Sequence, residues 1–259
     1  MMNNILEEIK LALQDDNLRD RTDRLEVLYP QVDNLELKSI LSNELGINYR
    51  DLGEYEKAVK YYKLAVENAK KNKMSDNEIG VCLINLAEGY RLKGDYEICK
   101  QKLDEAGKYI SSEDGFFYAS LLNYYGHYYL AINELENSLA GYKKSVEIIE
   151  KDPSNAIYLA TGYSNIANVY NRLEDYENSA NIFQKAKKLY DNGLLDKNSY
   201  YYKMMSSYIL TLINLQDERA SEYFDELTKY FEDEDISLDD KARLDIDKIK
   251  ILLEKNKNE

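Results

Sequence analysis

Hydrophobic and polar residues alternate along this chain with the period of an α-helix. The first apolar residues recur at intervals of three and four, which places them on one helical face: Ile5, Leu6, Ile9 and Leu13. A second short helix is expected over Arg19–Tyr29, and Pro30 should stop it because proline cannot continue the hydrogen-bond ladder. We expect the two helices to form an N-terminal cap over residues 1–39.

Five longer helical hairpins are expected after this cap. Their first helices centre near Asn43, Asn85, Asn123, Asn165 and Met205. Their turns, or the positions equivalent to turns, are Gly53, Gly94, Asn133, Glu174 and Leu215. Glycine, and after it asparagine, tolerates the positive φ that often ends a helix. Glu174 and Leu215 do not favour it, so those two turns should have another geometry or carry strain.

The end of the chain predicts one closing helix. Ser237 is a suitable N-cap for a helix over Leu238–Lys255, with acidic residues in its first turn. The expected organisation is therefore a cap over residues 1–39, a repeat array over 40–236, and a closing helix with its tail over 237–259.

One motif recurs in the hairpins. Its most complete copy has a small or large apolar residue at fixed places in both helices: Leu45, Gly46, Tyr49, Gly53, Tyr55, Ala58, Tyr62 and Ala65. The small residues let two helices approach closely, and the large ones fill the space beside them. Most of the 25 tyrosines are therefore interpreted as core residues with a hydroxyl near the surface.

This motif resembles the tetratricopeptide repeat, and the similarity covers roughly residues 40–230. The resemblance implies an all-α fold, a right-handed α-solenoid of about five such hairpins with helical caps. The period is about 40 residues, whereas the commonest period of the family is about 34. Repeats of similar length occur in bacterial peptide-pheromone receptors and in kinesin light chains.

Composition limits the partners. The chain has 259 residues and a formal net charge of -14, which disfavours nucleic acid and anionic membranes. Residues 217–247 contain 13 acidic and 4 basic residues. That stretch is either a patch for a basic partner or a solvated surface.

Candidate catalytic and metal-binding groups are scarce. The single histidine, His127, allows no histidine-dependent triad, and no glycine-rich phosphate loop is present. Cys82 and Cys99 are interpreted as reduced core residues because they occupy apolar or small positions of the repeat. The acidic run Asp233–Asp240 lacks the glycine of an EF-hand loop. We therefore expect neither enzymatic activity nor a cofactor or bound metal.

Polar residues form a stripe on the first helix of several hairpins. Residues spaced by three or four share one helical face, and in the tetratricopeptide family this face lines a concave groove. The resemblance implies a groove floored by Asn85, Glu88, Arg91, Tyr124, His127, Asn165, Asn168 and Arg172. Asparagine amides suit it because they both donate to and accept from an extended peptide. The alternative is that these asparagines are ordinary solvated residues and that His127 is structural.

The resulting functional prediction is a non-catalytic module that binds a protein or peptide. The alternative is a regulatory receptor for a short signalling peptide that changes conformation on binding. The N-terminus shows no signal-peptide pattern, and no apolar run approaches the length of a membrane span, so a cytoplasmic location is expected. Association of two copies through an end repeat stays open.

Overall fold

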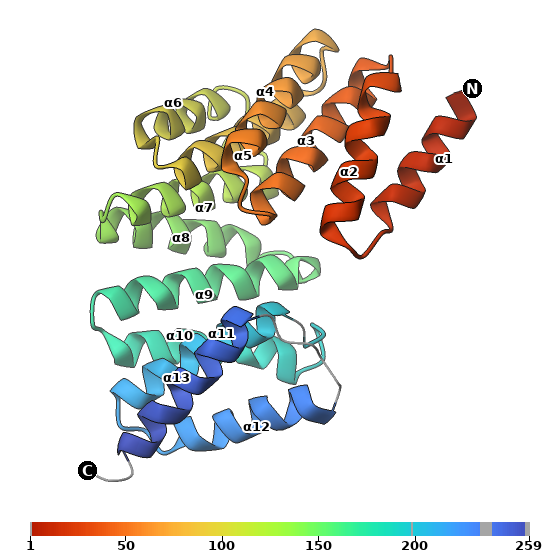
Figure 1. Ribbon diagram of the computed structural model, residues 1–259. Helices are drawn as coiled ribbons and strands as arrows, with labels where there is room; N and C mark the ends of the chain where they lie inside the picture. Colours follow the sequence, from red (N-terminus) through yellow and green to blue (C-terminus); the bar gives the residue numbers. More distant parts are fainter. Residues whose placement is uncertain (1, 198, 234–239, 257–259) are drawn as a thin grey trace. The chain divides into compact units, whose positions relative to one another are not determined.

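The computed structural model describes residues 2–197, 199–233 and 240–256. Every regular element in these ranges is a helix, as expected for an all-α fold, and consecutive helices pair as hairpins (Figure 1). The chain divides into two compact units, Met1–Glu134 and Leu135–Glu259.

The first unit begins with two shorter helices and continues with longer ones. The predicted cap helices are present as α1 and α2, and a short 3-10 turn, Tyr29–Gln31, follows at Pro30. Helix α3 packs on α4, α4 on α5, and α5 on α6. The bounds are α1 Met2–Leu13, α2 Leu18–Leu28, α3 Leu35–Asp51, α4 Tyr55–Lys71, α5 Asp76–Lys93, α6 Tyr96–Ala106 and α7 Phe116–Ala131.

The second unit is also built of paired helices. Helix α9 packs on α8 and α10, α11 on α10 and α12, and the closing helix α13 on α11. The proposed N-cap Ser237 lies outside the described residues, and α13 is described from Asp240. The bounds are α8 Leu135–Ile149, α9 Ala156–Arg172, α10 Tyr176–Asp191, α11 Ser199–Asn214, α12 Arg219–Asp233 and α13 Asp240–Asn256.

All five hairpin turns have the same backbone geometry. One residue in each turn has a left-handed φ: Gly53 76°, Gly94 85°, Asn133 63°, Glu174 59° and Gln216 54°. In each, the next residue's N–H donates back to the carbonyl five residues earlier, as Glu54 does to Tyr49 at 2.8 Å and Asp175 to Tyr170 at 2.9 Å. This is the Schellman motif, which satisfies carbonyls left free at the end of a helix.

The turn of the fifth hairpin corrects the sequence-based assignment by one residue. The left-handed position is Gln216 and not Leu215, and the N–H of Asp217 donates to Leu212 O at 2.9 Å. Of the two alternatives expected at Glu174, a different geometry is wrong, and backbone strain from a left-handed φ is what the structure shows. The backbones of Glu174 and Gln216 adopt a conformation that favours glycine, because the Schellman hydrogen bonds hold each turn in it.

Replacing Glu174 with glycine should stabilise the second unit by about 0.5–1 kcal/mol. A residue with a Cβ atom is penalised in the left-handed conformation, and this gain exceeds the extra freedom that glycine gives the unfolded chain. Thermal unfolding followed by circular dichroism measures the change. Glu177→Gly is the matched control: Glu177 is exposed in the first turn of α10, so glycine there should destabilise. A Glu174→Gly variant less stable than the wild-type protein would contradict the argument.

Small and large residues interlock in the first unit as the motif predicts. Tyr62 of α4 is fully buried, and a Cβ added at Gly46 would lie 2.5 Å from its ring. Ala58 and Ala65 have no exposed surface. Cys82 and Cys99 are both buried and free. Burial raises the pKa of the Cys82 thiol, and it raises the pKa of Cys99 to about 12. Both thiols therefore behave as core residues.

The N-terminal cap is held to the first hairpin by a partly buried carboxylate. Tyr61 of α4 donates to Glu26 of α2 at 2.6 Å, and the Tyr61 ring stacks on Tyr49 of α3. Burial alone would raise the pKa of Glu26, but hydrogen bonds from Tyr61 and Tyr49 hold it below its usual value. Arg19 pairs with Glu54 at 2.6 Å beyond the end of α3. These contacts fix α2 against α3 and α4.

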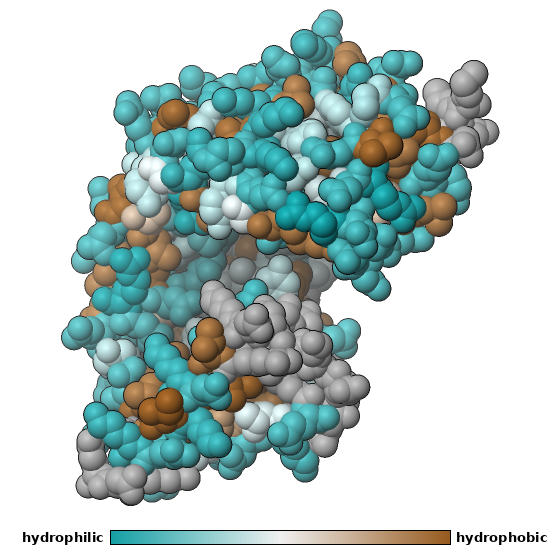
Figure 2. All heavy atoms as spheres, viewed as in Figure 1, coloured by the Kyte–Doolittle hydropathy of each residue, from teal (hydrophilic) through white to brown (hydrophobic). Residues whose placement is uncertain are grey.

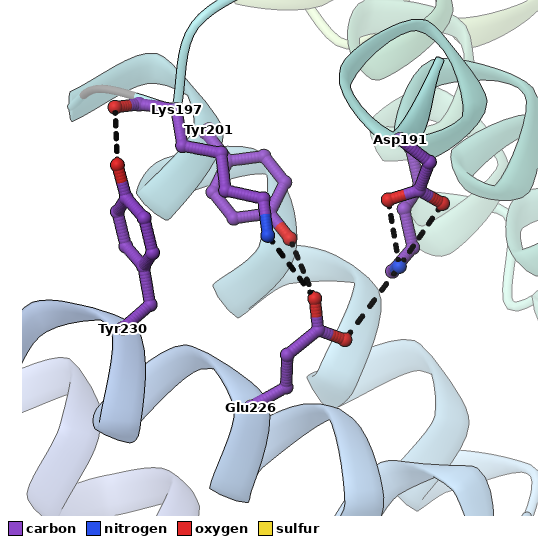
Figure 3. Close-up of polar contacts among 6 residues, drawn as sticks. Asp191, Lys197, Tyr201, Glu226 and Tyr230 are labelled. Atoms are coloured by element: carbon purple, nitrogen blue, oxygen red, sulfur yellow. Dashed lines mark hydrogen bonds and ion pairs between the residues drawn. The ribbon is translucent and has the colours of Figure 1, made fainter. Parts of the chain in front are cut away.

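A cluster of charged and phenolic side chains joins α10, α11 and α12 in the second unit (Figure 3). Glu226 of α12 lies 3.2 Å from Lys197 and 3.6 Å from Lys187, and Lys187 also pairs with Asp191 at 3.0 Å. Tyr230 donates to the backbone carbonyl of Lys197 at 3.2 Å. The fifth hairpin, whose motif is the weakest in the sequence, therefore adds these polar contacts to a buried apolar core that includes Met205, Leu212 and Leu227.

Candidate partner-binding surface

Two asparagines connect the first helices of successive hairpins in the first unit. Asn85 Nδ2 on α5 donates to Asn43 Oδ1 on α3 at 2.8 Å. Each amide has a second donor or acceptor position that pairs with no other described residue, so the pair can still bind a peptide backbone. Asn85 thus makes a structural hydrogen bond, and its role in binding stays a prediction.

Glu88 and Arg91 form a closed ion pair on α5. Arg91 Nε and Nη2 donate to the two carboxylate oxygens of Glu88, both at 2.7 Å. The side chains are 13% and 22% exposed. A bidentate pair is strong and directional, so it largely cancels the charge of both residues at this place. The surface therefore presents little net charge to a partner.

Tyr124 and His127 lie together on α7. Their ring centroids are 5.6 Å apart in an edge-on arrangement. Burial lowers the pKa of His127 to about 4, because the charged imidazolium is disfavoured away from water, although Glu88 opposes this shift. His127 is therefore neutral at physiological pH. Glu88 and Arg91 of α5 both act on the pKa of His127, so the predicted residues of α5 and α7 lie near one another.

Tyr62 contributes a group that the sequence analysis missed. It was interpreted only as a core residue, and its ring is indeed buried. Its hydroxyl is buried without a hydrogen-bond partner among the described residues, and its electrostatic neighbours include Arg50, Glu88 and Tyr124. Burial, the largest cause, raises the Tyr62 pKa. The motif fixes the ring position, but no sequence signal shows that the hydroxyl is unpaired.

The predicted residues of the second unit lie on α9. Asn165 and Asn168 are partly buried, and Arg172 is exposed in the last turn of the helix. A further polar bridge was not predicted: Thr211 Oγ1 of α11 donates to Asn171 Oδ1 of α9 at 3.0 Å. It joins first helices of successive hairpins, as Asn43 and Asn85 do in the first unit. Both bridges join polar residues about one repeat apart in the sequence, Asn43 with Asn85 and Asn171 with Thr211, and this spacing could have predicted them.

The predicted site residues contribute amide groups, an ion pair and aromatic rings. Among the described residues, no group of three or more His, Cys, Asp or Glu side chains could hold a metal ion. No helix in the described ranges has the length and apolarity that a membrane crossing requires. On the face drawn in Figure 2, hydrophilic residues predominate and hydrophobic ones are scattered. Recognition here would use amides, neutralised ion pairs and aromatic rings.

The fold and this polar surface define a protein built of helical-hairpin repeats. Residues 37–98 match a family model described as tetratricopeptide repeat, and residues 160–192 match a second model with the same description. The chain therefore belongs to the tetratricopeptide-repeat family. The first match covers the hairpin with the most complete motif, and the second covers the fourth hairpin. A search of curated proteins gives no match.

Solved structures show the same fold at low sequence identity. The apo form of RapI has a TM-score of 0.68 and 14% identity over 90% of this chain and 83% of its own. Yeast Tom70 has a TM-score of 0.66 and 16% identity over 98% of this chain and 47% of its own. Repeats of a putative kinesin light chain from Podosopora anserina have a TM-score of 0.58 and 15% identity, covering 76% of this chain and 96% of theirs. These similarities concern the fold alone.

Proposed function

We propose that this chain is a non-catalytic module that binds a protein or peptide through the first helices of its hairpins. The observation that carries the proposal is the Asn43–Asn85 bridge, whose remaining amide groups face no described partner. In the first unit the binding residues are Asn85, Glu88, Arg91, Tyr124 and His127. In the second unit they are Asn165, Asn168 and Arg172.

The chemistry of these residues supports binding over catalysis. Catalysis needs a base or nucleophile with a suitable pKa and a free position beside the substrate. His127 has a pKa of about 4, and Glu88 is held by Arg91 through two hydrogen bonds. Neither is prepared for proton transfer at neutral pH. The same groups are suited to hydrogen bonding with a peptide backbone.

The test compares two amide pairs of equal spacing on neighbouring helices. A partner captured from the native cell lysate is identified by mass spectrometry, and its affinity is then measured by calorimetry. The double substitution Asn165→Ala/Asn168→Ala on α9 should weaken the affinity for this partner at least about tenfold, which corresponds to about 1.4 kcal/mol of binding free energy. Asn178→Ala/Asn181→Ala is the matched control, since both residues are exposed on α10. Equal affinity in both double variants would contradict the assignment of α9.

A regulatory peptide receptor is the second candidate function. The division of the chain into two compact units favours it, because a ligand can bias a molecule whose parts have separate cores. Small-angle scattering with and without the captured peptide separates the candidates. A changed radius of gyration supports the receptor, and an unchanged one supports the simple binding module. The cytoplasmic location and a basic partner for the acidic segment stay predictions.

A further inference from the structure

The outer face of the closing helix α13 carries two large apolar residues that are open to solvent. Leu244 is 68% exposed and Ile251 is 65% exposed. Among the described large hydrophobic residues, only Val27 of α2 is exposed to a similar extent, at 66%. Single exposed apolar residues are ordinary on protein surfaces, whereas exposed apolar residues that lie together indicate an interaction site.

Leu244 and Ile251 lie on one line along α13, on the side away from its buried face. Seven residues separate them, which is close to two full turns of an α-helix, so both side chains project from the same face. Ile249 and Leu253 are 0% and 9% exposed, and α13 packs on α11 and α12. The buried pair is turned by about 160° from the exposed line, at 100° per residue.

This arrangement departs from what a closing helix requires. The terminal helix of a repeat array has one face without a neighbouring repeat, and that face is ordinarily polar because it meets water. In α13 the centre of the outer face is apolar at two places, Leu244 and Ile251. The face is therefore suited to a partner as well as to solvent.

Two opposite charges lie between the apolar residues on this face. Asp247 and Lys248 each lie about 50° from the line through Leu244 and Ile251, one on either side of it. Both side chains are exposed, and neither makes an ion pair with a described residue. Along α13 the face thus presents an apolar residue, a charged pair and a second apolar residue.

We propose that this face binds the same face of a second copy of the chain, with the two α13 helices parallel about a two-fold axis. Leu244 then packs against the partner's Leu244, and Ile251 against the partner's Ile251. The two-fold axis brings the left side of one face to the right side of the other, so each Asp247 lies beside the partner's Lys248. The contact consists of two apolar layers with two ion pairs between them.

Charge complementarity supports a second copy as the occupant and the parallel orientation of the helices. A two-fold interface uses the same patch on both subunits, so the patch must be complementary to itself. In an antiparallel pair with Leu244 directly opposite the partner's Ile251, the side that carries Asp247 would meet the same side of the partner. Asp247 would then face the partner's Asp247, and like charges opposite one another destabilise an interface.

The small size of the face sets the strength of the contact. Stable dimers bury about 1,200–2,000 Å² of surface in total, and a face two helical turns long buries less. We therefore expect a weak dimer that forms only at high protein concentration, with a Kd on the order of 100 µM.

The first experiment measures association by sedimentation equilibrium from about 20 µM to about 500 µM protein. The weight-average mass of the wild-type protein should rise with concentration towards that of a dimer. Ile251→Lys should keep the protein monomeric, whereas Val27→Lys is the matched control and should associate as the wild type does, because Val27 is equally exposed on another helix. A wild-type protein that stays monomeric, or an Ile251→Lys variant that still associates, would overturn the proposal.

The second experiment exchanges the charges between two chains. Asp247→Lys and Lys248→Asp should each weaken self-association at least about tenfold, since each variant places like charges beside one another. A mixture of the two variants should associate again, because each chain then supplies the charge that the other needs. Fluorescent labelling of one variant follows the mixed dimer in the ultracentrifuge. Failure of the mixture to associate would overturn the proposed ion pairs.

The third experiment tests the parallel orientation by cross-linking. Ile251→Cys places two thiols at the two-fold axis, where oxidised glutathione should link them as a disulfide dimer on a non-reducing gel. In the antiparallel pair the two thiols would be about 10 Å apart along the helices, which is too far for a disulfide. Cys82 and Cys99 are buried and do not compete. Val27→Cys should give no dimer, and an Ile251→Cys variant that associates without cross-linking would exclude the parallel arrangement.

The inference goes beyond the proposed peptide binding and can fail independently of it. The residues assigned to binding in the second unit lie on α9, and none of the assigned residues lies on α13. The variant Ile251→Lys should therefore lose self-association and keep its affinity for a captured partner, and loss of both would mean that α13 serves partner binding and not association of two copies.

Discussion

Replacing Gly46 with alanine should destabilise the first unit by about 1–3 kcal/mol. A Cβ at this position would lie 2.5 Å from both Cδ1 and Cε1 of Tyr62. The ring has little room to move away, because its other edge lies against Gly89 of α5, so closely that a Cβ added there would be 3.1 Å from Cδ2. Alanine has the better helix propensity by about 1 kcal/mol, so the clash must exceed that gain.

Urea unfolding followed by circular dichroism gives the loss, and hydrogen exchange in α3 and α5 locates it. Gly107→Ala is the matched control. Gly107 has a φ of -65°, and the nearest atom to an added Cβ is 3.6 Å away, so alanine should leave stability unchanged or slightly improve it. A Gly46→Ala variant that unfolds at the wild-type urea concentration would show that Tyr62 repacks at little cost.

The sequence predicted the fold well because the repeat places its structural information in local motifs. Small residues such as Gly46 and Ala65 and large ones such as Tyr62 occur at fixed spacing, and each hairpin buries them in the same way. The turn chemistry was less predictable. Glu174 and Gln216 adopt left-handed φ values because tertiary packing and the Schellman hydrogen bonds override their local preference.

The candidate surface was predictable only in part. Helical spacing alone indicated that Glu88 and Arg91 share a face, and the structure shows them paired at 2.7 Å. The bridge from Asn85 to Asn43 depends on how α3 and α5 pack, which a single sequence does not specify. Long-range contacts of this kind require the folded chain.

Replacing Glu226 with glutamine should destabilise the second unit by about 1–2 kcal/mol. The Lys187 side chain is only 11% exposed, and Lys197 would lose its carboxylate partner at 3.2 Å (Figure 3). Fully buried pairs cost about 3–5 kcal/mol to break, and exposed pairs cost less than about 1. Glu226 is 38% exposed, so an intermediate value is expected.

Thermal unfolding at several pH values tests both the size and the origin of this loss. Burial alone would lower the pKa of Lys187, but Asp191 and Glu226 together raise it above its usual value. The ion-pair contribution is therefore complete below the unfolded pKa and disappears as the pH rises through the folded pKa, so the variant and wild-type proteins should converge at strongly alkaline pH. Glu222→Gln, at an exposed position of α12, is the control and should change stability by less than about 0.5 kcal/mol. A pH-independent difference between the Glu226→Gln and wild-type proteins would mean that side-chain packing, and not charge, holds α12 in place.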